Sequence, residues 1–351
     1  MDTGESPTWK CEATLTDVEE IVQGMKIPLC RAFLSPYQDE NGQWIFYGRG
    51  NLGVATINLP HAALSAKGDI NKFWEILDER LELCRRVGEL RYNKMKGVKA
   101  KVAPILWQHG AISRLNPDDD VIEAINKKGF TVTLGYSGIY ETVKVLTGLS
   151  HTTEEGFKLA EEIMAHLKGK CEEWKKAQPH LRFALYGTPQ ESTTEWFSKS
   201  LIRDFGEIEG ICGKNKLWVT NSYHVDILEQ IDAFSKLEIE GKLQNYSTGG
   251  AVSYVETYNM QKNPEALIQL VQFMYENIIY AEINFESDIC GNCGYSGTMD
   301  NDPETLEWVC PQCGNRDQDS LSVVRRTCGY LGETKWTKGR LMDILNRVKH
   351  L

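Results

Sequence analysis

Ten cysteines occur in this 351-residue chain, and four of them form two matched pairs near the C-terminus. Cys290 and Cys293 are separated by two residues, and the same spacing recurs in Cys310 and Cys313. Two such Cys-x-x-Cys turns can present four thiolates tetrahedrally, which is the arrangement that a structural zinc ion prefers. Because four sulfurs fill the coordination sphere, the pattern predicts a structural metal. Two disulfides are the alternative, but nothing in the sequence indicates secretion.

A glycine-containing motif, RRTCGYLG, follows the cysteines at positions 325–332. From composition alone it is a turn in which Gly329 supplies an unusual backbone angle. A four-cysteine motif followed by RRTCGYLG near the end of a chain closely resembles the anaerobic (class III) ribonucleotide reductases. In that family this glycine carries a stable backbone radical, so the resemblance implies that Gly329 stores the radical. A glycine radical can flatten and delocalise into both flanking peptide groups because no Cβ is present.

An isolated cysteine, Cys30, lies in an apolar segment near the N-terminus, and Asn51 follows within the run GRGNLG. Taken alone, Cys30 is by default a core residue. The runs CRAFLS, GRGNLG and VATINLP, however, resemble the finger loop of the same reductase family, here at about 26–53. The resemblance implies that Cys30 forms the thiyl radical and that Asn51 lies beside the ribose.

The run GTPQEST at 187–193 follows a predicted strand. Thr188 is a suitable N-cap, Pro189 a suitable first helical residue, and Glu191 would complete a capping box. This pattern is typical either of a well-capped helix or of a phosphate site, because first-turn N–H groups converge on an anion. GTPQES resembles the family's substrate-phosphate loop. The candidate substrate contacts are therefore Thr188, Gln190, Glu191, Ser192 and Thr193.

The segment TNSYH at 220–224 resembles the edge of the family's active site. It implies weak ribose or phosphate contacts from Asn221 and Ser222. A lone histidine is more often a satisfied polar residue than a catalyst, so no role is assigned to His224. Glu141, which follows the glycine-bracketed turn at 135–138, is expected to be solvated or to start a helix.

Strands and helices are expected to alternate between these motifs. Apolar residues recur at helical spacing over 69–92, with Asp69 as N-cap, and further helices are predicted at 152–177 and 263–280. The predicted strands, with a hairpin at about 39–47, are 54–59, 102–107, 130–134, 182–186, 217–220, 252–256 and 281–285. This alternation predicts an α/β fold with largely parallel strand pairing.

The resemblance extends over roughly residues 17–351 and implies the second half of a ten-stranded α/β barrel. Residues 1–285 would form the partial barrel, 286–318 the four-cysteine zinc ribbon, and 319–351 the glycyl-radical loop and tail. The family's regulatory nucleotide-binding domain, first barrel strands and upstream partner cysteine have no counterpart here, and Cys11 lies in no family motif. We therefore expect one piece of a split or truncated reductase, completed by an N-terminal partner half, because a half-barrel exposes sheet edges.

The composition limits the classes of function. The net charge is −10 and 41% of residues are apolar, which supports a packed core and gives no basic footprint for nucleic acid or an anionic membrane. No secretory signal or bilayer-length apolar run is present, and the free cysteines fit a reducing cytoplasm.

The resemblance implies anaerobic conversion of ribonucleoside triphosphates to 2′-deoxyribonucleoside triphosphates. An S-adenosylmethionine activase with a [4Fe–4S] cluster would install the radical, and the chain would form a homo-oligomer. Formate is the expected reductant and a thiol system the alternative.

Three alternatives remain. The chain could be a zinc-ribbon module that binds protein or nucleic acid, although no Lys or Arg lies between Cys290 and Cys313. It could be an inactive scaffold. It could also be another glycyl-radical enzyme, but pyruvate formate-lyase would show two adjacent cysteines where Leu29, Cys30 and Arg31 stand, and its family lacks the cysteine ribbon.

Overall fold

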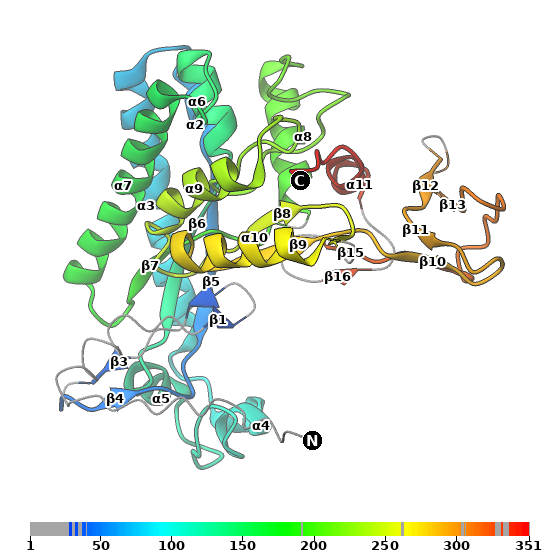
Figure 1. The fold of residues 1–351 in the computed structure, drawn as a ribbon. Coiled ribbons are helices and arrows are strands. Elements are labelled where there is room, and N and C mark those ends of the chain that lie inside the picture. The colour runs from blue at the N-terminus through cyan, green and yellow to red at the C-terminus, as the bar shows by residue number, and fades with distance from the viewer. Residues whose placement is uncertain are drawn as a thin grey trace.

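The structure, a computed structural model, describes residues 28–29, 32–33, 37–39, 41–190, 192–260, 263–302, 305, 307–326, 331–332 and 337–350. Cys30, Glu191 and Gly329 lie outside these residues, and the predictions made for them stay predictions. Figure 1 shows a body of helices and strands from which the cysteine-bearing segment projects to one side.

Parallel strands form the sheet of the body. β5 (Asn51–Asn58), β6 (Thr131–Ser137) and β7 (Phe183–Tyr186) pair in that order, and β8 (Ser253–Glu256) pairs with β9 (Ala281–Asn284). A parallel bridge from Tyr186 to Gly250, just before β8, connects the two groups. The predicted α/β class with parallel pairing is confirmed. The described strands form no closed sheet, and β5 and β9 remain edge strands.

Helices pack on this sheet through apolar stripes. α3 (Ile70–Met95) contacts β5 and β6, and its residues Phe73, Leu77 and Leu81 are fully buried. Asp69 caps α3 as predicted, since its carboxylate accepts from two first-turn N–H groups. The other helices are α2 (Leu59–Ser65), α4 (Pro104–Trp107), α5 (Val121–Lys127), α6 (Ile139–Thr147), α7 (Glu154–Ala177), α8 (Thr193–Phe205), α9 (Ala233–Gln244), α10 (Pro264–Asn277) and α11 (Lys338–Leu345), with a 3₁₀ turn η1 (Ala100–Val102). None of the described helices has the length and apolar character that a bilayer crossing requires.

Short strands complete the described secondary structure. The N-terminal hairpins are β1 (Pro28–Leu29) with β2 (Ala32–Phe33) and β3 (Tyr37–Gln38) with β4 (Trp44–Ile45). The cysteine-bearing segment contains β10 (Asp288–Cys290), β11 (Ser296–Gly297), β12 (Asp300–Asn301), β13 (Trp308–Val309) and β14 (Leu321–Ser322), followed by the hairpin β15 (Arg325–Arg326) and β16 (Leu331–Gly332). The core of this segment includes Met299, Trp308, Leu321 and Val323, together with Leu341 of α11.

Two predicted strands are wrong. Residues 102–107 form the end of η1 and then α4, because Pro104 suits the first turn of a helix and cannot donate to a strand ladder. Residues 217–220 form no strand because their backbone bonds elsewhere: Val219 N–H donates to Thr194 O (3.1 Å), and Thr220 O accepts from Gly138 N–H (2.9 Å).

Gly88 allows α3 to approach the sheet closely. A Cβ at this position would lie 2.5 Å from Val132 Cγ1 and 2.9 Å from Phe183 Cε1. We expect Gly88→Ala to lower the free energy of unfolding by about 1–2 kcal/mol, because overpacking outweighs the gain in helix propensity. In α7, a Cβ at Gly169 would meet no atom within 4 Å, so the control Gly169→Ala should instead raise the free energy by about 0.5–1 kcal/mol. Urea unfolding measures the free energy of both variants, and equal stabilisation by the two substitutions would contradict the close contact of Gly88 with the sheet.

Candidate active site and metal centre

Four of the predicted substrate residues lie together beyond the carboxyl ends of β6 and β7. Ser222 Oγ is 2.9 Å from Asn221 Oδ1 and 3.4 Å from the carbonyl oxygen of Thr188. Gln190 is 1% exposed and donates from Nε2 to the carbonyl oxygen of Tyr136 in β6. Its Oε1 is buried without a hydrogen-bond partner among the described residues. The carboxyl ends of parallel strands are where open α/β sheets bind ligands, so this group is a candidate binding site.

The helix expected to start at Pro189 starts later. α8 begins at Thr193 with Ser192 as its N-cap, and Ser192 makes no side-chain capping bond. Thr188, the predicted cap, donates instead to the carbonyl oxygen of Tyr186 (3.2 Å), while Gln190 is held by β6. An anion near Ser192 and Thr193 would meet the N-terminus of α8, where the Ser192 side chain makes no capping bond.

Asn51 lies apart from this group, at the start of β5. Its Oδ1 accepts from Gly53 N–H (2.7 Å), and its Nδ2 donates to Thr133 Oγ1 (3.0 Å). Thr56, five residues later, has its hydroxyl oxygen 3.4 Å from Thr188 Oγ1. At about 3.3 Å per residue, Asn51 is therefore roughly 16 Å along the strand from the loop.

A group of buried charges adjoins Asn221, and sequence reasoning missed it. Glu141, expected to be solvated or to start a helix, does lie in the first turn of α6, but it is fully buried. Its Oε1 accepts from the N–H and hydroxyl of Thr220 (2.8 and 2.7 Å). Lys216 Nζ lies 3.1 Å from Glu141 Oε1 and also pairs with Asp226. Burial lowers the pKa of Lys216, but the two carboxylates outweigh it and raise that pKa. The cluster fixes Thr220 and thereby the position of Asn221.

His224 is a satisfied structural residue, as expected. Its Nδ1 lies 2.6 Å from the carbonyl oxygen of Asn221 and its Nε2 lies 2.8 Å from that of Val252. The ring stacks between Tyr223 and Tyr254. His224 thus links the segment of Asn221 to the start of β8.

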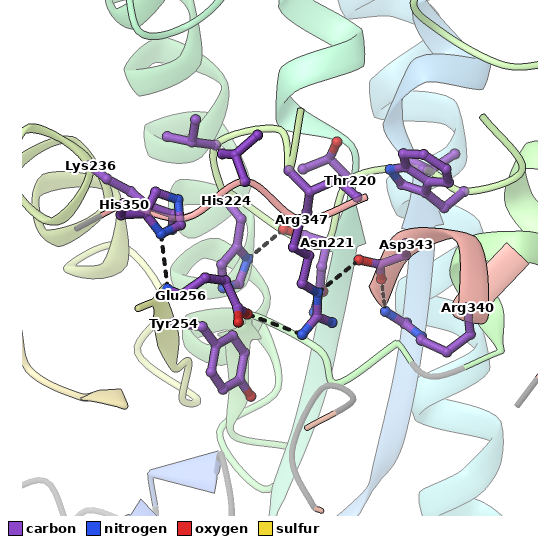
Figure 2. A pocket seen from close by; sticks show the side chains of 15 residues that line it. Thr220, Asn221, His224, Lys236, Tyr254, Glu256, Arg340, Asp343, Arg347 and His350 are labelled. Carbon is purple, nitrogen blue, oxygen red and sulfur yellow. Dashed lines mark hydrogen bonds and ion pairs between the residues drawn. The ribbon is translucent and has the colours of Figure 1, made fainter. Parts of the chain in front are cut away.

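A cavity of about 60 Å³ separates the 218–227 segment from the C-terminal residues. Figure 2 shows Arg340 and Asp343 of α11 on one side of it, with Arg347 reaching between Asp343 and Glu256. His350 lies near Glu256, whose N–H donates to His350 Nδ1 (2.9 Å). These buried charges near the C-terminus were also missed by sequence reasoning.

His350 is expected to make stability depend on pH. Burial lowers its pKa from 6.5 to about 4. The pKa of His350 is lower in the folded than in the unfolded state, so the unfolded state binds the proton more tightly. The free energy of unfolding is therefore highest above pH 6.5 and falls between pH 6.5 and 4, by about 2 kcal/mol at pH 5. Urea unfolding at about pH 7.5 and about pH 5 measures this loss. His350→Asn should reduce this pH-dependent loss of stability, whereas His109→Asn, at an exposed site, should leave it unchanged. Part of the loss should remain in His350→Asn, because burial also lowers the pKa of His151 to about 4.

The four cysteines converge as predicted. Their sulfurs all lie within 4.8 Å of one another, with 3.8 Å between Cys290 and Cys313 and 3.6 Å between Cys293 and Cys310. Zinc–sulfur bonds of about 2.3 Å in a tetrahedron place sulfurs about 3.8 Å apart. The cluster therefore has the donor set and spacing to bind a metal ion.

The thiols of this cluster differ in acidity. Burial raises the pKa of Cys290, but hydrogen bonds from the N–H groups of Cys293 and Asn292 and from the Asn315 side chain outweigh it and lower the pKa to about 6. The Tyr295 N–H lowers the pKa of Cys293, but burial and the neighbouring sulfurs raise it to about 12. Four thiolates this close repel one another, and a divalent cation allows all four to ionise together.

A buried ion pair joins the cysteine-bearing segment to β15. Arg325 contacts both carboxylate oxygens of Asp288, with Nη2 2.7 Å from Oδ2. Asp288 begins the strand that ends at Cys290, and the Arg325 guanidinium lies 5.0 Å from the ring centroid of Trp308. The cysteine-bearing segment therefore holds β15, the strand that precedes residues 327–330.

Comparison with known proteins agrees with this arrangement. Residues 7–350 match the family model of the anaerobic ribonucleoside-triphosphate reductase. The chain is 37% identical over 341 residues to the Escherichia coli K12 anaerobic ribonucleoside-triphosphate reductase, covering 95% of this chain and 47% of that protein. It is also 37% identical to the phage T4 enzyme over 341 residues, covering 94% and 54%. The chain spans about half the length of these curated relatives.

Solved structures show the same fold. An anaerobic ribonucleotide reductase superposes with a TM-score of 0.60 at 18% identity, over 90% of this chain and 47% of its own. The Thermotoga maritima anaerobic ribonucleotide reductase with MES in the active site gives 0.59 at 20% identity, over 85% and 46%. With its sequence and its fold both matched, the chain belongs to the anaerobic ribonucleoside-triphosphate reductase family.

Proposed function

We propose that this chain is the C-terminal, radical-bearing half of an anaerobic ribonucleoside-triphosphate reductase, which converts ribonucleoside triphosphates to 2′-deoxyribonucleoside triphosphates. The proposal rests on the connection between the four-cysteine cluster and the strand that precedes Gly329. In this chain, which belongs to the reductase family, the Asp288–Arg325 ion pair makes that connection. On this proposal the cluster holds zinc and has a structural role.

The reaction would proceed by a radical relay. A partner activase with an iron–sulfur cluster and S-adenosylmethionine removes a hydrogen atom from Gly329, and the glycyl radical takes one from Cys30. The Cys30 thiyl radical abstracts the ribose 3′-hydrogen. The 2′-hydroxyl, hydrogen-bonded by Asn51, takes up a proton and leaves as water, and after reduction Cys30 returns the hydrogen to C3′. Formate supplies the reducing electrons, with a thiol system as the alternative. The protein's part is to position and shield the reactive groups.

The nucleotide would lie along the sheet. Its phosphates would bind where Thr188, Gln190, Asn221 and Ser222 meet, with Glu191, Ser192 and Thr193 completing the loop. Its sugar would point away from the loop, towards Asn51 at the start of β5. Gln190 Oε1, which is buried and without a hydrogen-bond partner among the described residues, can accept from a hydroxyl or amino group of the ligand.

A second half of the enzyme would complete the site. Among the described strands, β5 and β9 are edge strands, and Leu83, Val87 and Leu90 on one flank of α3 are 53%, 39% and 58% exposed. Open edges and apolar flanks favour covering by another chain segment. An N-terminal half would add the missing strands of the ten-stranded barrel, and the homo-oligomer would work in a reducing cytoplasm.

Anaerobic electron paramagnetic resonance tests the proposal. The chain is incubated with a matching activase and S-adenosylmethionine, with and without an N-terminal half, and nucleotide reduction is followed in parallel. A glycyl doublet is expected, and its dependence on the added half would establish the split. No radical under either condition, with the metal bound and the fold intact, would favour a zinc-ribbon scaffold without chemistry of its own.

A further inference from the structure

We propose that Arg340 and Arg347, bridged by Asp343, couple the predicted substrate-phosphate loop (187–193) to the β15–β16 hairpin, whose connection contains Gly329. The three residues, here called the guanidinium bridge, are positioning residues. The inference rests on the proposed function, because it requires that this loop bind nucleotide.

One end of the guanidinium bridge holds the loop. Arg340 Nη2 donates to the carbonyl oxygen of Gln190 (2.8 Å) and lies 3.2 Å from Thr194 Oγ1. Arg340 is only 3% exposed. The preceding residue, Gly339, also connects α11 to α8, because its N–H donates to Glu195 Oε2 (2.7 Å). The start of α11 is therefore bound both to the loop and to the first turn of α8.

Asp343 connects the two arginines. One of its carboxylate oxygens contacts Arg340 and the other accepts from Arg347 Nε (3.2 Å), as Figure 2 shows. Burial raises the pKa of Asp343, but Arg347 and Arg340 outweigh it and lower that pKa. The carboxylate is therefore ionised at neutral pH and keeps both arginines in place.

The other end of the bridge holds the hairpin. Arg347 Nη1 donates to the carbonyl oxygen of Arg326 (3.1 Å), and it also pairs with Glu256 Oε1 (3.1 Å). Arg326 pairs with Leu331 across β15 and β16. Arg347 thus fixes the last described residue before the connection that contains Gly329.

These four charges balance one another in a buried place. Two guanidinium groups face two carboxylates, Asp343 and Glu256, and their side chains are at most 12% exposed. Moving one group away would remove an ion-pair partner from a buried charge beside it, so the contacts are expected to form and break together. A ligand that orders Gln190 would stabilise the hairpin, and by reciprocity the ordered hairpin would strengthen ligand binding.

Hydrogen–deuterium exchange of the full 351-residue chain, alone and with an N-terminal half, tests the coupling. The probes are CTP and, for the phosphates alone, inorganic triphosphate. In the unaltered chain, CTP should slow amide exchange in β15, β16 and α11 by about fivefold or more. Arg340→Gln should still bind CTP but lose this slowing at the hairpin. Arg203→Gln, an exposed arginine of α8 (side chain 73% exposed), is the matched control and should retain it.

A second arm needs no nucleotide. Arg347 contacts the hairpin, yet Arg347→Gln should speed amide exchange at residues 187–194. The double variant with Arg340→Gln should exchange little faster there than either single variant, as expected for one connected unit. If Arg340→Gln fails to fold, Arg340→Lys replaces it, since lysine keeps the charge near Asp343 but gives a smaller CTP effect than arginine.

The outcomes separate the two proposals. If CTP binds but leaves hairpin exchange unchanged, or if Arg340→Gln keeps the CTP effect, the coupling is wrong while the proposed function stands. If the unaltered chain binds no CTP even with an N-terminal half added, the proposed function fails and the coupling fails with it. Additive effects of the two arginine variants on residues 187–194 would also overturn the bridge.

Discussion

Gly329→Ala should abolish the glycyl radical signal and reduce nucleotide reduction to background, while metal content and the unfolding curve stay unchanged. The reason is the side chain, because a Cβ hinders the flattening that lets the α-carbon radical delocalise into both peptide groups. Anaerobic electron paramagnetic resonance after activation measures the signal, and deoxyribonucleotide formation measures the activity. A doublet of undiminished intensity in Gly329→Ala would show that the radical is stored elsewhere.

Cys30→Ala is the matched variant because it acts one step later in the proposed relay. It should keep the glycyl doublet and still lose nucleotide reduction, since no thiyl radical can form at that position. The pair therefore separates radical storage from radical transfer. Reduction that persists in Cys30→Ala would assign the thiyl role to another cysteine.

Features set by local spacing could be predicted from the sequence. The paired cysteines converge because each Cys-x-x-Cys turn is short and its geometry is nearly independent of the rest of the fold. α3 was predicted with its cap because Asp69 and the apolar repeat act within a few turns of one helix. The same holds for the buried strands of the sheet, which lie between clear turn signals.

Features set by long-range contacts could not be predicted. Thr188 and Pro189 have the pattern of a helix start, yet the loop bonds to β6 through Gln190 and the helix begins at Thr193. Glu141 starts a helix, as one alternative predicted, but its burial could not be predicted because its cation partner, Lys216, is 75 positions away in the sequence. The closely spaced charges of the C-terminal helix resemble a solvated helix face, and only the fold shows that Arg340 and Asp343 are buried.

Cys310→Ser should remove the metal and unfold the cysteine-bearing segment while the body stays folded. Cys310 is 1% exposed, and the core of this segment, to which α11 contributes Leu341, is a separate cluster from the main core of the body. Metal binding in structural zinc sites contributes about 10–16 kcal/mol to folding, more than so small a core can replace. Metal analysis should fall from about one equivalent to near zero. Cys84→Ser, at a free cysteine of α3, is the control and should keep its metal.

The same variant tests whether the metal acts on the radical loop through Asp288. Without the folded segment, the buried Asp288–Arg325 pair loses its support, and β15 is no longer held from that side. The glycyl doublet should therefore weaken in Cys310→Ser although Gly329 is unchanged, and exchange at β15 should rise. Asp288→Asn should produce the same loss while keeping the metal, because it breaks the ion pair and leaves four cysteines. A full-intensity doublet in both variants would mean that the ribbon does not position the radical loop.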